Sequence, residues 1–231
     1  MIEDLPALTV ARTIERPADD RLAALRDAPT GFLVDALGGR GGLDHRIKPL
    51  SGTPERLFGV ALTCDAGPDD NLAVFGALSQ AQPGDVVVIA TGGWEGSAVI
   101  GDNVAGMLRN KGVTGVVTDG LVRDAAGIVR VGLPVFCRGV TPNSPARQGP
   151  GSAGLPVTLG GITIASGDVV SGDVDGVVIV PRARLDAVAA RLSAIAAAEA
   201  EMEAQVAGGL TDPAWLGDVL APDAVRWHDD G

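Results

Sequence analysis

The chain has 231 residues, 46% of them hydrophobic, which is enough to bury the core of one globular domain. Its formal net charge of -11 opposes binding to a phosphate backbone, so nucleic acid is not an expected partner. No apolar run is long enough to cross a membrane, and the acidic N-terminus does not resemble a signal peptide, so we expect a soluble, cytoplasmic protein.

Strands and helices are predicted to alternate through the first part of the chain. Residues 19–38 indicate two short helices separated by a Pro-Thr-Gly interruption. Residues 56–67 form an apolar run, and residues 71–85 have helical spacing that ends at a Pro-Gly pair. The elements that follow are strand 85–90, glycine-rich loop 91–102, helix 103–112, strand 113–120, turn 121–124, helix 125–132 and strand 133–139. This order predicts an α/β core with some parallel strand pairs.

A loop and two hairpins are expected next. Residues 141–156 are rich in proline and glycine and predict a surface loop. Residues 157–181 predict antiparallel hairpins, with turns at Gly160–Gly161 and Asp175–Gly176. We expect residues 1–209 to form one domain, and residues 210–231 to form a tail that could pack on a neighbouring subunit.

A carboxylate interrupts the apolar stripe of the long helix predicted from Arg182 to Val206. The stripe follows alternating steps of three and four residues, at Leu185, Val188, Leu192, Ile195, Met202 and Val206. Glu199 occupies the position between Ile195 and Met202. It could lie at the edge of the stripe with its carboxylate in water, or it could be presented to a site on a neighbouring subunit.

Familiar catalytic and cofactor signatures are missing from the sequence, which contains no GxSxG, HExxH or GxxxxGK[ST] motif. His45 and His228 are far apart, so we expect neither serine-histidine hydrolysis nor a zinc site, and we expect both histidines on the surface or in loops. A GxGxxG pattern at Gly149–Gly154 precedes a strand-like segment where a dinucleotide site needs a helix, so we interpret it as a loop. Cys64 and Cys137 lie in apolar strand-like segments, where buried reduced thiols are more common than a disulfide.

Residues that could bind an anion or a cation are grouped between residues 92 and 124. The strands at 85–90 and 113–120 are expected in one sheet, so the loops that follow them leave at corresponding carboxyl ends, where α/β sheets bind ligands. Asp102 and Asn103 begin the next helix, whose first N-H groups could bind a carboxylate that Gly101 allows to approach. Alternatively, Asp102 could cap this helix.

Arg123 and Asp124 are adjacent in a turn that follows a strand. The guanidinium can hold a carboxylate or a keto oxygen in a forked geometry, and the neighbouring carboxylate can ligate a hard divalent cation. An ordinary surface ion pair is the alternative. The position of the pair at a strand end favours a site for a 2-oxo acid.

The stretch from residue 83 to residue 145 closely resembles the family of 4-hydroxy-4-methyl-2-oxoglutarate aldolases and regulator of RNase E activity A (RraA)-like proteins. The strongest marker is an acidic residue, twenty intervening residues and then Arg-Asp, which Asp102, Arg123 and Asp124 match. Flanking segments extend the resemblance to about residues 20–209. It implies a layered α/β/α-type sandwich with a long C-terminal helix, assembled as homotrimers or homohexamers with sites at subunit interfaces.

The resemblance also assigns roles to individual residues. It implies Mg²⁺ or Mn²⁺ held by Asp124, and pyruvate held by Arg123 and by the backbone of Gly101, Asp102, Asn103 and Val104. It makes Glu199 an acidic residue that reaches the site of a neighbouring subunit, which agrees with its place in the apolar stripe.

Two features depart from the family pattern. Gly127 stands where many members have Glu or Asp, which leaves the substrate open, and the tail after Leu210 is longer than usual.

These implications predict a metal-dependent lyase that cleaves 4-hydroxy-2-oxo acids to pyruvate and a carbonyl product. The metal and Arg123 would neutralise the enolate, while a water organised by Asp102 and a neighbour's Glu199 would take the C4 hydroxyl proton. Oxaloacetate decarboxylation is expected as well, because it passes through the same enolate. The alternatives are a related enzyme for another 2-oxo acid and a non-catalytic inhibitor of an RNA-processing enzyme.

Overall fold

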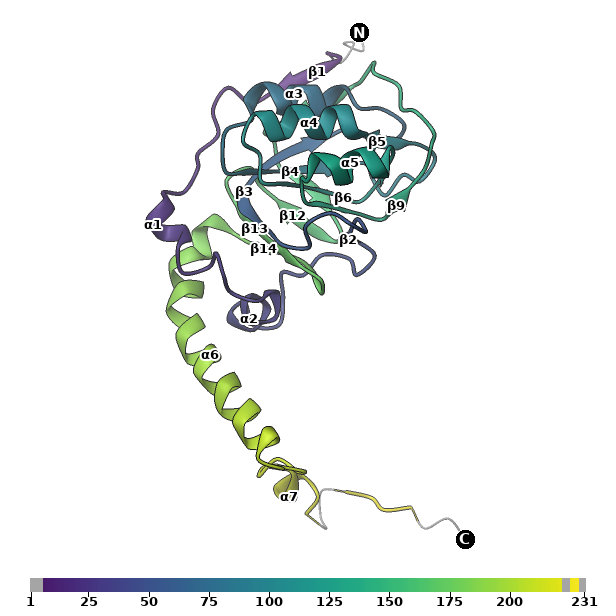
Figure 1. Ribbon diagram of the computed structural model, residues 1–231. Helices are drawn as coiled ribbons and strands as arrows, with labels where there is room; N and C mark the ends of the chain where they lie inside the picture. The colour runs from purple at the N-terminus through teal and green to yellow at the C-terminus, as the bar shows by residue number, and fades with distance from the viewer. Residues whose placement is uncertain (1–5, 222–224, 229–231) are drawn as a thin grey trace. The chain divides into compact units, whose positions relative to one another are not determined.

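Four parallel strands form the centre of the main sheet in the computed structural model, which describes residues 6–221 and 225–228 (Figure 1). They are β3 (Leu57–Asp65), β4 (Asp85–Ala90), β6 (Gly115–Thr118) and β8 (Val135–Cys137), adjacent in that order. Every residue of β4, β6 and β8 is buried. Such burial on both faces suits their valine-rich sequences, and it confirms the expected parallel core.

Shorter strands complete a sheet of nine strands. β2 (Lys48–Pro49) pairs antiparallel with β8, and β13 (Val169–Asp173) pairs antiparallel with both β3 and β14 (Gly176–Val180). β10 (Gly151–Ala153) pairs with the end of β3 and with β1 (Leu8–Val10). Part of the expected surface loop at 141–156 is therefore a strand of the main sheet. No helix follows it, so the GxGxxG pattern is not a dinucleotide fingerprint.

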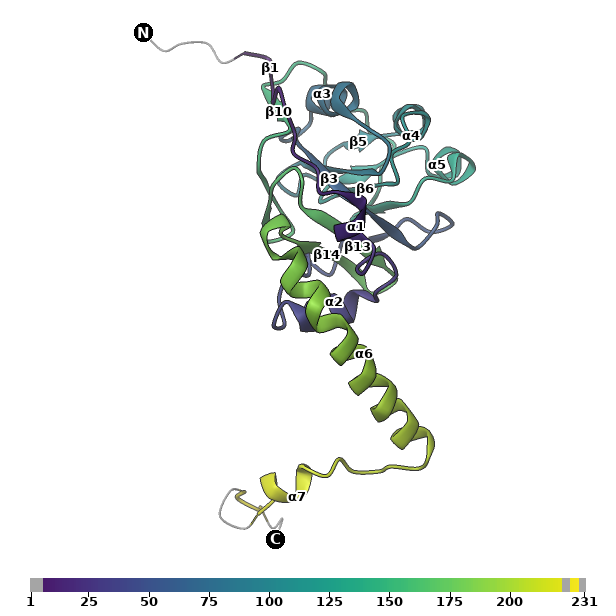
Figure 2. The ribbon, with the colours of Figure 1, turned by 90° about the vertical axis from the view of Figure 1, so that its left-hand side faces the viewer.

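Three helices cover one face of the main sheet (Figure 2). They are α3 (Leu72–Gln80), α4 (Asp102–Asn110) and α5 (Ala125–Val131). Their apolar side chains share one buried core with Ile89 of β4 and Val116 of β6. The helices expected over residues 71–85, 103–112 and 125–132 are therefore confirmed.

The opposite face of the sheet is covered by an antiparallel hairpin of β11 (Val157–Leu159) and β12 (Ile162–Ile164). Near the N-terminus, α1 (Asp19–Leu22) precedes α2 (Thr30–Ala36), and α2 contacts β13 and β14. Both predicted hairpins are confirmed, as is the layered α/β fold class.

A second, smaller sheet consists of three parallel strands, β5 (Ala98–Ile100), β7 (Leu121–Val122) and β9 (Gly139–Val140). The sequence predicted a loop at 91–102 and a turn at 121–124, so these short strands were missed. Each has only two or three residues, too few to show a periodic pattern.

The long helix links two units, Met1–Leu192 and Ser193–Gly231. It consists of a short 3₁₀ turn, η1 (Arg182–Arg184), and α6 (Leu185–Ala207), as predicted. Leu192 is the last buried residue in the described part of the chain, and the second unit also contains α7 (Leu216–Val219). The apolar stripe of α6 is buried only in its first two turns. The expected domain of residues 1–209 and the expected tail of residues 210–231 stay predictions.

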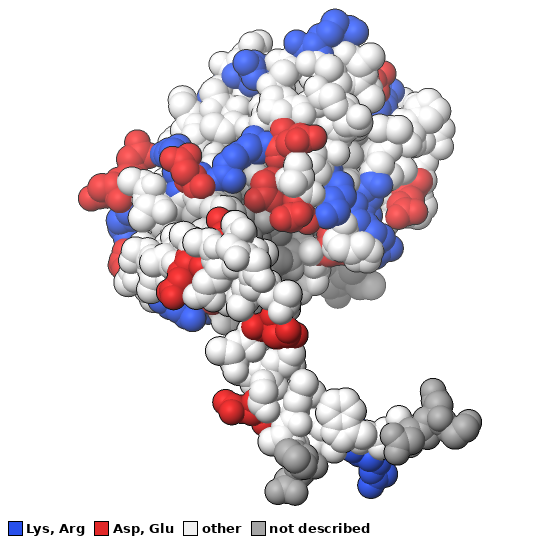
Figure 3. Space-filling view, turned by 60° about the horizontal axis from the view of Figure 1, so that its bottom comes forward, with Lys and Arg blue, Asp and Glu red and all other residues white. Residues whose placement is uncertain are grey.

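The remaining sequence expectations concern individual side chains. Cys64 and Cys137 are both buried and unbonded, and His45 and His228 are exposed, as expected. Acidic and basic side chains are intermixed on the face drawn in Figure 3. Within the residues described, no helix combines the length and apolarity needed to cross a bilayer.

Candidate active site

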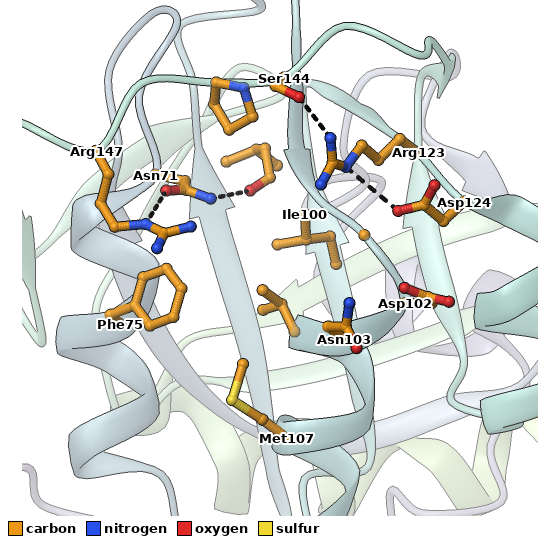
Figure 4. Close-up of a pocket in the computed structure, with 14 residues that line it drawn as sticks. Asn71, Phe75, Ile100, Asp102, Asn103, Met107, Arg123, Asp124, Ser144 and Arg147 are labelled. Carbon is orange, nitrogen blue, oxygen red and sulfur yellow. Dashed lines mark hydrogen bonds and ion pairs between the residues drawn. The ribbon is translucent and has the colours of Figure 1, made fainter.

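The chain segments that follow the three strands of the small sheet meet around one cavity (Figure 4). β5 leads into Gly101 and α4, β7 leads into Arg123 and Asp124, and β9 leads into the loop that carries Ser144 and Arg147. Parallel strands end at the same edge of a sheet, so their following residues converge. The sequence placed the candidate site in the loop after β4 and in the turn after β6. Each of these segments contains a further short strand, β5 or β7, so the cavity lies at the ends of β5, β7 and β9.

The cavity has a volume of about 400 Å³, within the usual range for small-molecule sites. Asp102, Arg123 and Asp124 lie on one side of it in Figure 4, and Phe75 and Arg147 lie on the other. The cavity therefore offers both signs of charge and one aromatic wall. It can accommodate a small anion together with a cation.

Arg123 and Asp124 form an ion pair at the cavity wall. Arg123 Nε lies 3.3 Å from Asp124 Oδ2, and the two side chains are 38% and 46% exposed. The Arg123 Nη1 group also donates a hydrogen bond of 2.5 Å to Ser144 Oγ. The ion pair that the sequence left as an alternative does exist, but its partners face the cavity and remain open to a ligand.

Asp124 adopts a left-handed backbone conformation, with φ 55° and ψ 40°. A residue other than glycine pays about 1–2 kcal/mol for this conformation, although Asp tolerates it better than most. Asp124 is the N-cap residue of α5, yet its side chain makes no capping hydrogen bond. The carboxylate of Asp124 therefore lines the cavity and does not cap the helix.

Gly101 is the N-cap residue of α4 and closes the cavity beside Arg123 and Asp124. A Cβ atom at Gly101 would lie 2.5 Å from Asp124 Oδ2 and 3.1 Å from Arg123 Cγ. A side chain at position 101 would push the Asp124 carboxylate away from its present place. Asp102 is the first residue of the helix and makes no capping hydrogen bond, so the alternative role as a helix cap is wrong.

The first turn of α4 contributes Asp102, Asn103 and Val104 to the cavity wall. The first N-H groups of a helix have no partners within the helix, and the helix dipole favours an anion beside them. The first intrahelical bond here runs from Ala105 N to Gly101 O at 3.1 Å. The three preceding N-H groups have no hydrogen-bond acceptor among the described residues, and the predicted binding of a carboxylate by them stays a prediction.

Sequence reasoning missed eight residues of the cavity wall, among them the polar or aromatic residues Asn71, Phe75, Ser144 and Arg147. Asn71 and Phe75 belong to the start of α3, which the sequence indicated only as an apolar helix. Ser144 and Arg147 lie in the Pro/Gly-rich loop, where nothing in the residue pattern distinguishes a cavity wall from solvent. The one available signal was a single arginine in that loop.

Two buried aspartates hold the loops of the site. Asp70 accepts hydrogen bonds from the backbone of Leu72, Gln148 and Gly149 at 2.7, 2.6 and 3.1 Å. Burial alone would raise the pKa of Asp70, but the backbone N-H donors outweigh it and lower the pKa. Asp119, after β6, accepts hydrogen bonds from the backbone of Thr91 and Gly93 at 2.7 and 3.0 Å. Neither carboxylate is free for ligand binding.

Glu199 belongs to the second unit, where its side chain is exposed. Its predicted role at the site of a neighbouring subunit stays a prediction.

The donor set of the cavity suits a hard divalent cation that takes few ligands from protein. Within the described ranges, no three His, Cys, Asp or Glu side chains lie close enough to form a metal cluster. The cavity supplies the carboxylates of Asp102 and Asp124 and neither thiol nor imidazole. Mg²⁺ and Mn²⁺ accept such sites, because water and substrate oxygens complete their coordination.

Comparison with known proteins finds clear relatives. The RraA-like family model, described as Aldolase/RraA, matches residues 22–179. A Halalkalibacterium halodurans protein named "Putative 4-hydroxy-4-methyl-2-oxoglutarate aldolase" is 39% identical over 163 residues, covering 71% of this chain and 77% of that protein.

Solved structures also match. An uncharacterized protein from Pseudomonas syringae pv. tomato str. DC3000 has a TM-score of 0.73 at 27% identity, covering 85% of this chain and 96% of that one. RraAS2 of Streptomyces coelicolor, an unusual member of the RNase ES inhibitor RraA protein family, has a TM-score of 0.71 at 28% identity, covering 83% and 99%. The range matched by the family model includes all residues that line the cavity.

Proposed function

The chain belongs to the RraA-like (Aldolase/RraA) family, and on this basis we propose that it is a divalent-metal-dependent lyase. Its substrates would be 4-hydroxy-2-oxo acids such as 4-hydroxy-4-methyl-2-oxoglutarate, cleaved between C3 and C4 to pyruvate and a carbonyl product. Oxaloacetate decarboxylation would be a second activity. The name of the Halalkalibacterium halodurans relative supports the aldolase assignment.

One observation carries the proposal: Arg123, Asp124 and the open first turn of α4 surround the same cavity. The N-H groups of Asp102, Asn103 and Val104 would bind the C1 carboxylate, since a helix N-terminus favours an anion. The Arg123 guanidinium would face the C2 keto oxygen and stabilise the negative charge that develops there as the C3-C4 bond breaks. Binding the carboxylate and stabilising the developing charge require neither a base nor a nucleophile from the protein.

Asp124, with Asp102 nearby in the cavity wall, would hold Mg²⁺ or Mn²⁺. When bound, such an ion supplies Lewis-acid stabilisation of the 2-oxo acid oxygens. Asp102 and Glu199 of a neighbouring copy would orient the water that accepts the proton of the C4 hydroxyl. This last role requires a homo-oligomer, and a trimer or a hexamer would provide it.

The direct test measures pyruvate release from 4-hydroxy-4-methyl-2-oxoglutarate and from oxaloacetate, with Mg²⁺, with Mn²⁺ and with EDTA. We expect metal-dependent release, and a loss of at least about 100-fold in kcat for Arg123→Lys, because an ammonium cannot reproduce the forked donor. Arg12→Lys is the matched control, since Arg12 is exposed and lies outside the cavity. Unchanged turnover in Arg123→Lys would refute the assigned role, and no release from either acid would refute the lyase.

The second candidate is a non-catalytic inhibitor of an RNA-processing enzyme. The similarity to Streptomyces coelicolor RraAS2, of the RNase ES inhibitor family, favours it. Such a role needs a shaped surface but neither metal nor turnover. If wild type and Asp124→Asn inhibit an RNase E-type nuclease equally well, and the wild-type protein releases no pyruvate, this candidate replaces the lyase.

A further inference from the structure

We propose that Arg147 is a specificity-determining residue that binds the distal carboxylate of a dicarboxylic 2-oxo acid. This inference rests on the proposed function, because it assumes that the C1 carboxylate and the keto group occupy the side of the cavity formed by Arg123 and α4. It adds a second binding position, on the opposite side. A monocarboxylic 2-oxo acid would leave that position without its ligand.

The side chain of Arg147 is oriented by two neighbours in the cavity wall (Figure 4). Its Nε group donates a hydrogen bond of 3.2 Å to Asn71 Oδ1, and its Cζ atom lies 4.4 Å from the ring centroid of Phe75. Asn71 is only 4% exposed, and its Nδ2 group donates to Val99 O at 3.3 Å. The guanidinium plane is therefore fixed on an aromatic face, in an orientation set by a buried amide.

The outer edge of this guanidinium has no protein partner among the described residues. Among the described residues, the Arg147 side chain makes one hydrogen bond, from Nε to Asn71, and no ion pair with a carboxylate. Arg123, in contrast, is paired with Asp124. The two Nη groups of Arg147 can thus form the forked pair of hydrogen bonds that a carboxylate accepts.

The backbone around Arg147 is held as firmly as its side chain. Asn71 N donates to Ala146 O at 3.1 Å, and Ala146 N donates to Asp69 O at 2.7 Å. On the other side, the Gln148 and Gly149 N-H groups donate to the carboxylate of Asp70. Because the backbone on both sides of Arg147 is hydrogen-bonded to the segment before α3, the position of the Arg147 residue is fixed. Binding a carboxylate would cost little ordering of the loop.

The charges of the cavity agree with a dianionic ligand. Its charged lining consists of two carboxylates, Asp102 and Asp124, and two guanidiniums, Arg123 and Arg147, which sum to zero formal charge. With the divalent cation of the proposed function, the sum becomes +2. A dicarboxylic 2-oxo acid carries two negative charges and would balance it, whereas a monocarboxylic acid would leave one positive charge of the cavity without a partner.

The test compares the binding of two five-carbon acids by calorimetry in the presence of Mg²⁺. 2-Oxoglutarate has the second carboxylate and 2-oxopentanoate lacks it. Neither has a C4 hydroxyl, so neither can be cleaved. We expect the wild-type protein to prefer 2-oxoglutarate by roughly 10- to 100-fold in Kd, the usual effect of a charge-assisted pair. Arg147→Met should reduce the preference to about 2-fold or less.

Two further variants make the comparison specific. Arg147→Lys keeps the charge but loses the fork and the bond to Asn71, so its preference should be intermediate. Arg12→Met removes an exposed arginine outside the cavity and should keep the full preference. Thermal melting would verify that Arg147→Met is folded, which we expect because the side chain is largely exposed and lies outside the buried cores.

The outcomes separate this inference from the proposed function. A wild-type protein without a preference for 2-oxoglutarate would overturn the inference, and so would a preference that survives in Arg147→Met. If the preference depends on Arg147 but no 4-hydroxy-2-oxo acid releases pyruvate, the inference stands and the lyase assignment fails. If pyruvate is released, kcat/KM for 4-hydroxy-2-oxoglutarate should fall in Arg147→Met by the same factor as the binding preference, with 4-hydroxy-2-oxopentanoate little changed.

Discussion

Gly127 of α5 lies directly against the carboxylate side chain of Asp102 at the start of α4. A Cβ atom at Gly127 would lie 2.6 Å from Asp102 Cβ and 2.7 Å from its Cγ, and still closer to Oδ2. These separations are too short for any real contact. The space that a side chain at position 127 would occupy is therefore filled by Asp102, and the glycine determines where that carboxylate stands.

Gly127→Ala is expected to displace Asp102 and to slow the proposed reaction. Misplacing a catalytic group by about 1 Å can cost roughly 100-fold in rate, so we expect kcat to fall by about 10- to 100-fold. KM should change less, because the other groups that bind substrate stay in place. Steady-state kinetics of pyruvate release would measure both.

Gly106→Ala is the matched control, because Gly106 belongs to the facing helix and its nearest neighbour, Val131 Cγ2, would lie 3.9 Å from the new methyl group. Within a helix, alanine is favoured over glycine by about 0.5–1 kcal/mol, so this variant should be more stable and equally active. Equal activity in both variants would mean that the position of Asp102 does not matter.

At position 124, asparagine and alanine should have different effects on stability. Asn tolerates the left-handed conformation of Asp124, whereas Ala does not. We expect Asp124→Ala to be less stable than Asp124→Asn by about 1 kcal/mol in urea denaturation. Calorimetry with Mn²⁺ should show that both variants lose divalent-ion affinity, because both lack the carboxylate. Asp124→Gly, which relieves the backbone strain, should be the most stable of the three variants. If Asp124→Ala were the most stable and Asp124→Gly the least, the backbone at position 124 would not be strained.

Asp70→Asn should destabilise the protein at neutral pH and much less in acid. Both carboxylate oxygens of Asp70 accept backbone N-H bonds, so the NH₂ group of the new asparagine would face a donor. Loss of that bond should lower the free energy of unfolding by about 1–3 kcal/mol. The pKa of Asp70 is lowered by folding, so its stabilisation is complete above the ordinary value of 3.8 and is lost as the pH falls further. Urea denaturation at pH 7 and pH 3 should show the difference from wild type shrinking.

The control for this pH dependence is Asp27→Asn, which changes an exposed aspartate. Its difference from wild type should be small and similar at both pH values. A gap between Asp70→Asn and wild type that stays constant from pH 7 to pH 3 would contradict the role given to Asp70.

Both cysteines should be unreactive in the native protein. Burial raises the pKa of the Cys137 thiol to about 11 and raises that of Cys64 further. Only the thiolate attacks a chromogenic disulfide reagent and releases its coloured product. Native protein at pH 8 should therefore give almost no absorbance change with this reagent. In denaturant both thiols of each chain should react. Rapid reaction of either thiol without denaturant would show that its strand opens locally.

The buried strands and the long helices could be predicted from the sequence because their patterns are continuous. Residues 85–90 are apolar throughout, and the structure buries all six in β4. The family resemblance, marked by the interval from Asp102 to Arg123, also indicated one wall of the cavity. In both cases the interactions are local, or they repeat over enough residues to form a pattern.

The opposite wall could not be predicted, because it depends on contacts between distant segments. Arg147 reaches the cavity only through the bonds that tie residues 146–149 to Asp69, Asp70 and Asn71, more than seventy positions earlier. The strands β5, β7 and β9 are likewise defined by each other rather than by their own two or three residues. The left-handed backbone of Asp124 has no sequence signal either, since Asp is common in other conformations.

The path of the chain through α4 and β6 explains the interval of twenty residues between Asp102 and Arg123, which follow the small-sheet strands β5 and β7. The nine residues of α4 advance the chain by about 13.5 Å in one direction, and the four residues of β6 return it by about 13 Å. The interval is thus the length of a round trip that starts and finishes at one edge. A loop inserted at its far end, between Lys111 and Thr114, would leave both ends where they are. Proteins with such an insertion would keep the arrangement of Asp102, Arg123 and Asp124 in space, but a sequence motif with a fixed interval of twenty residues would not detect them.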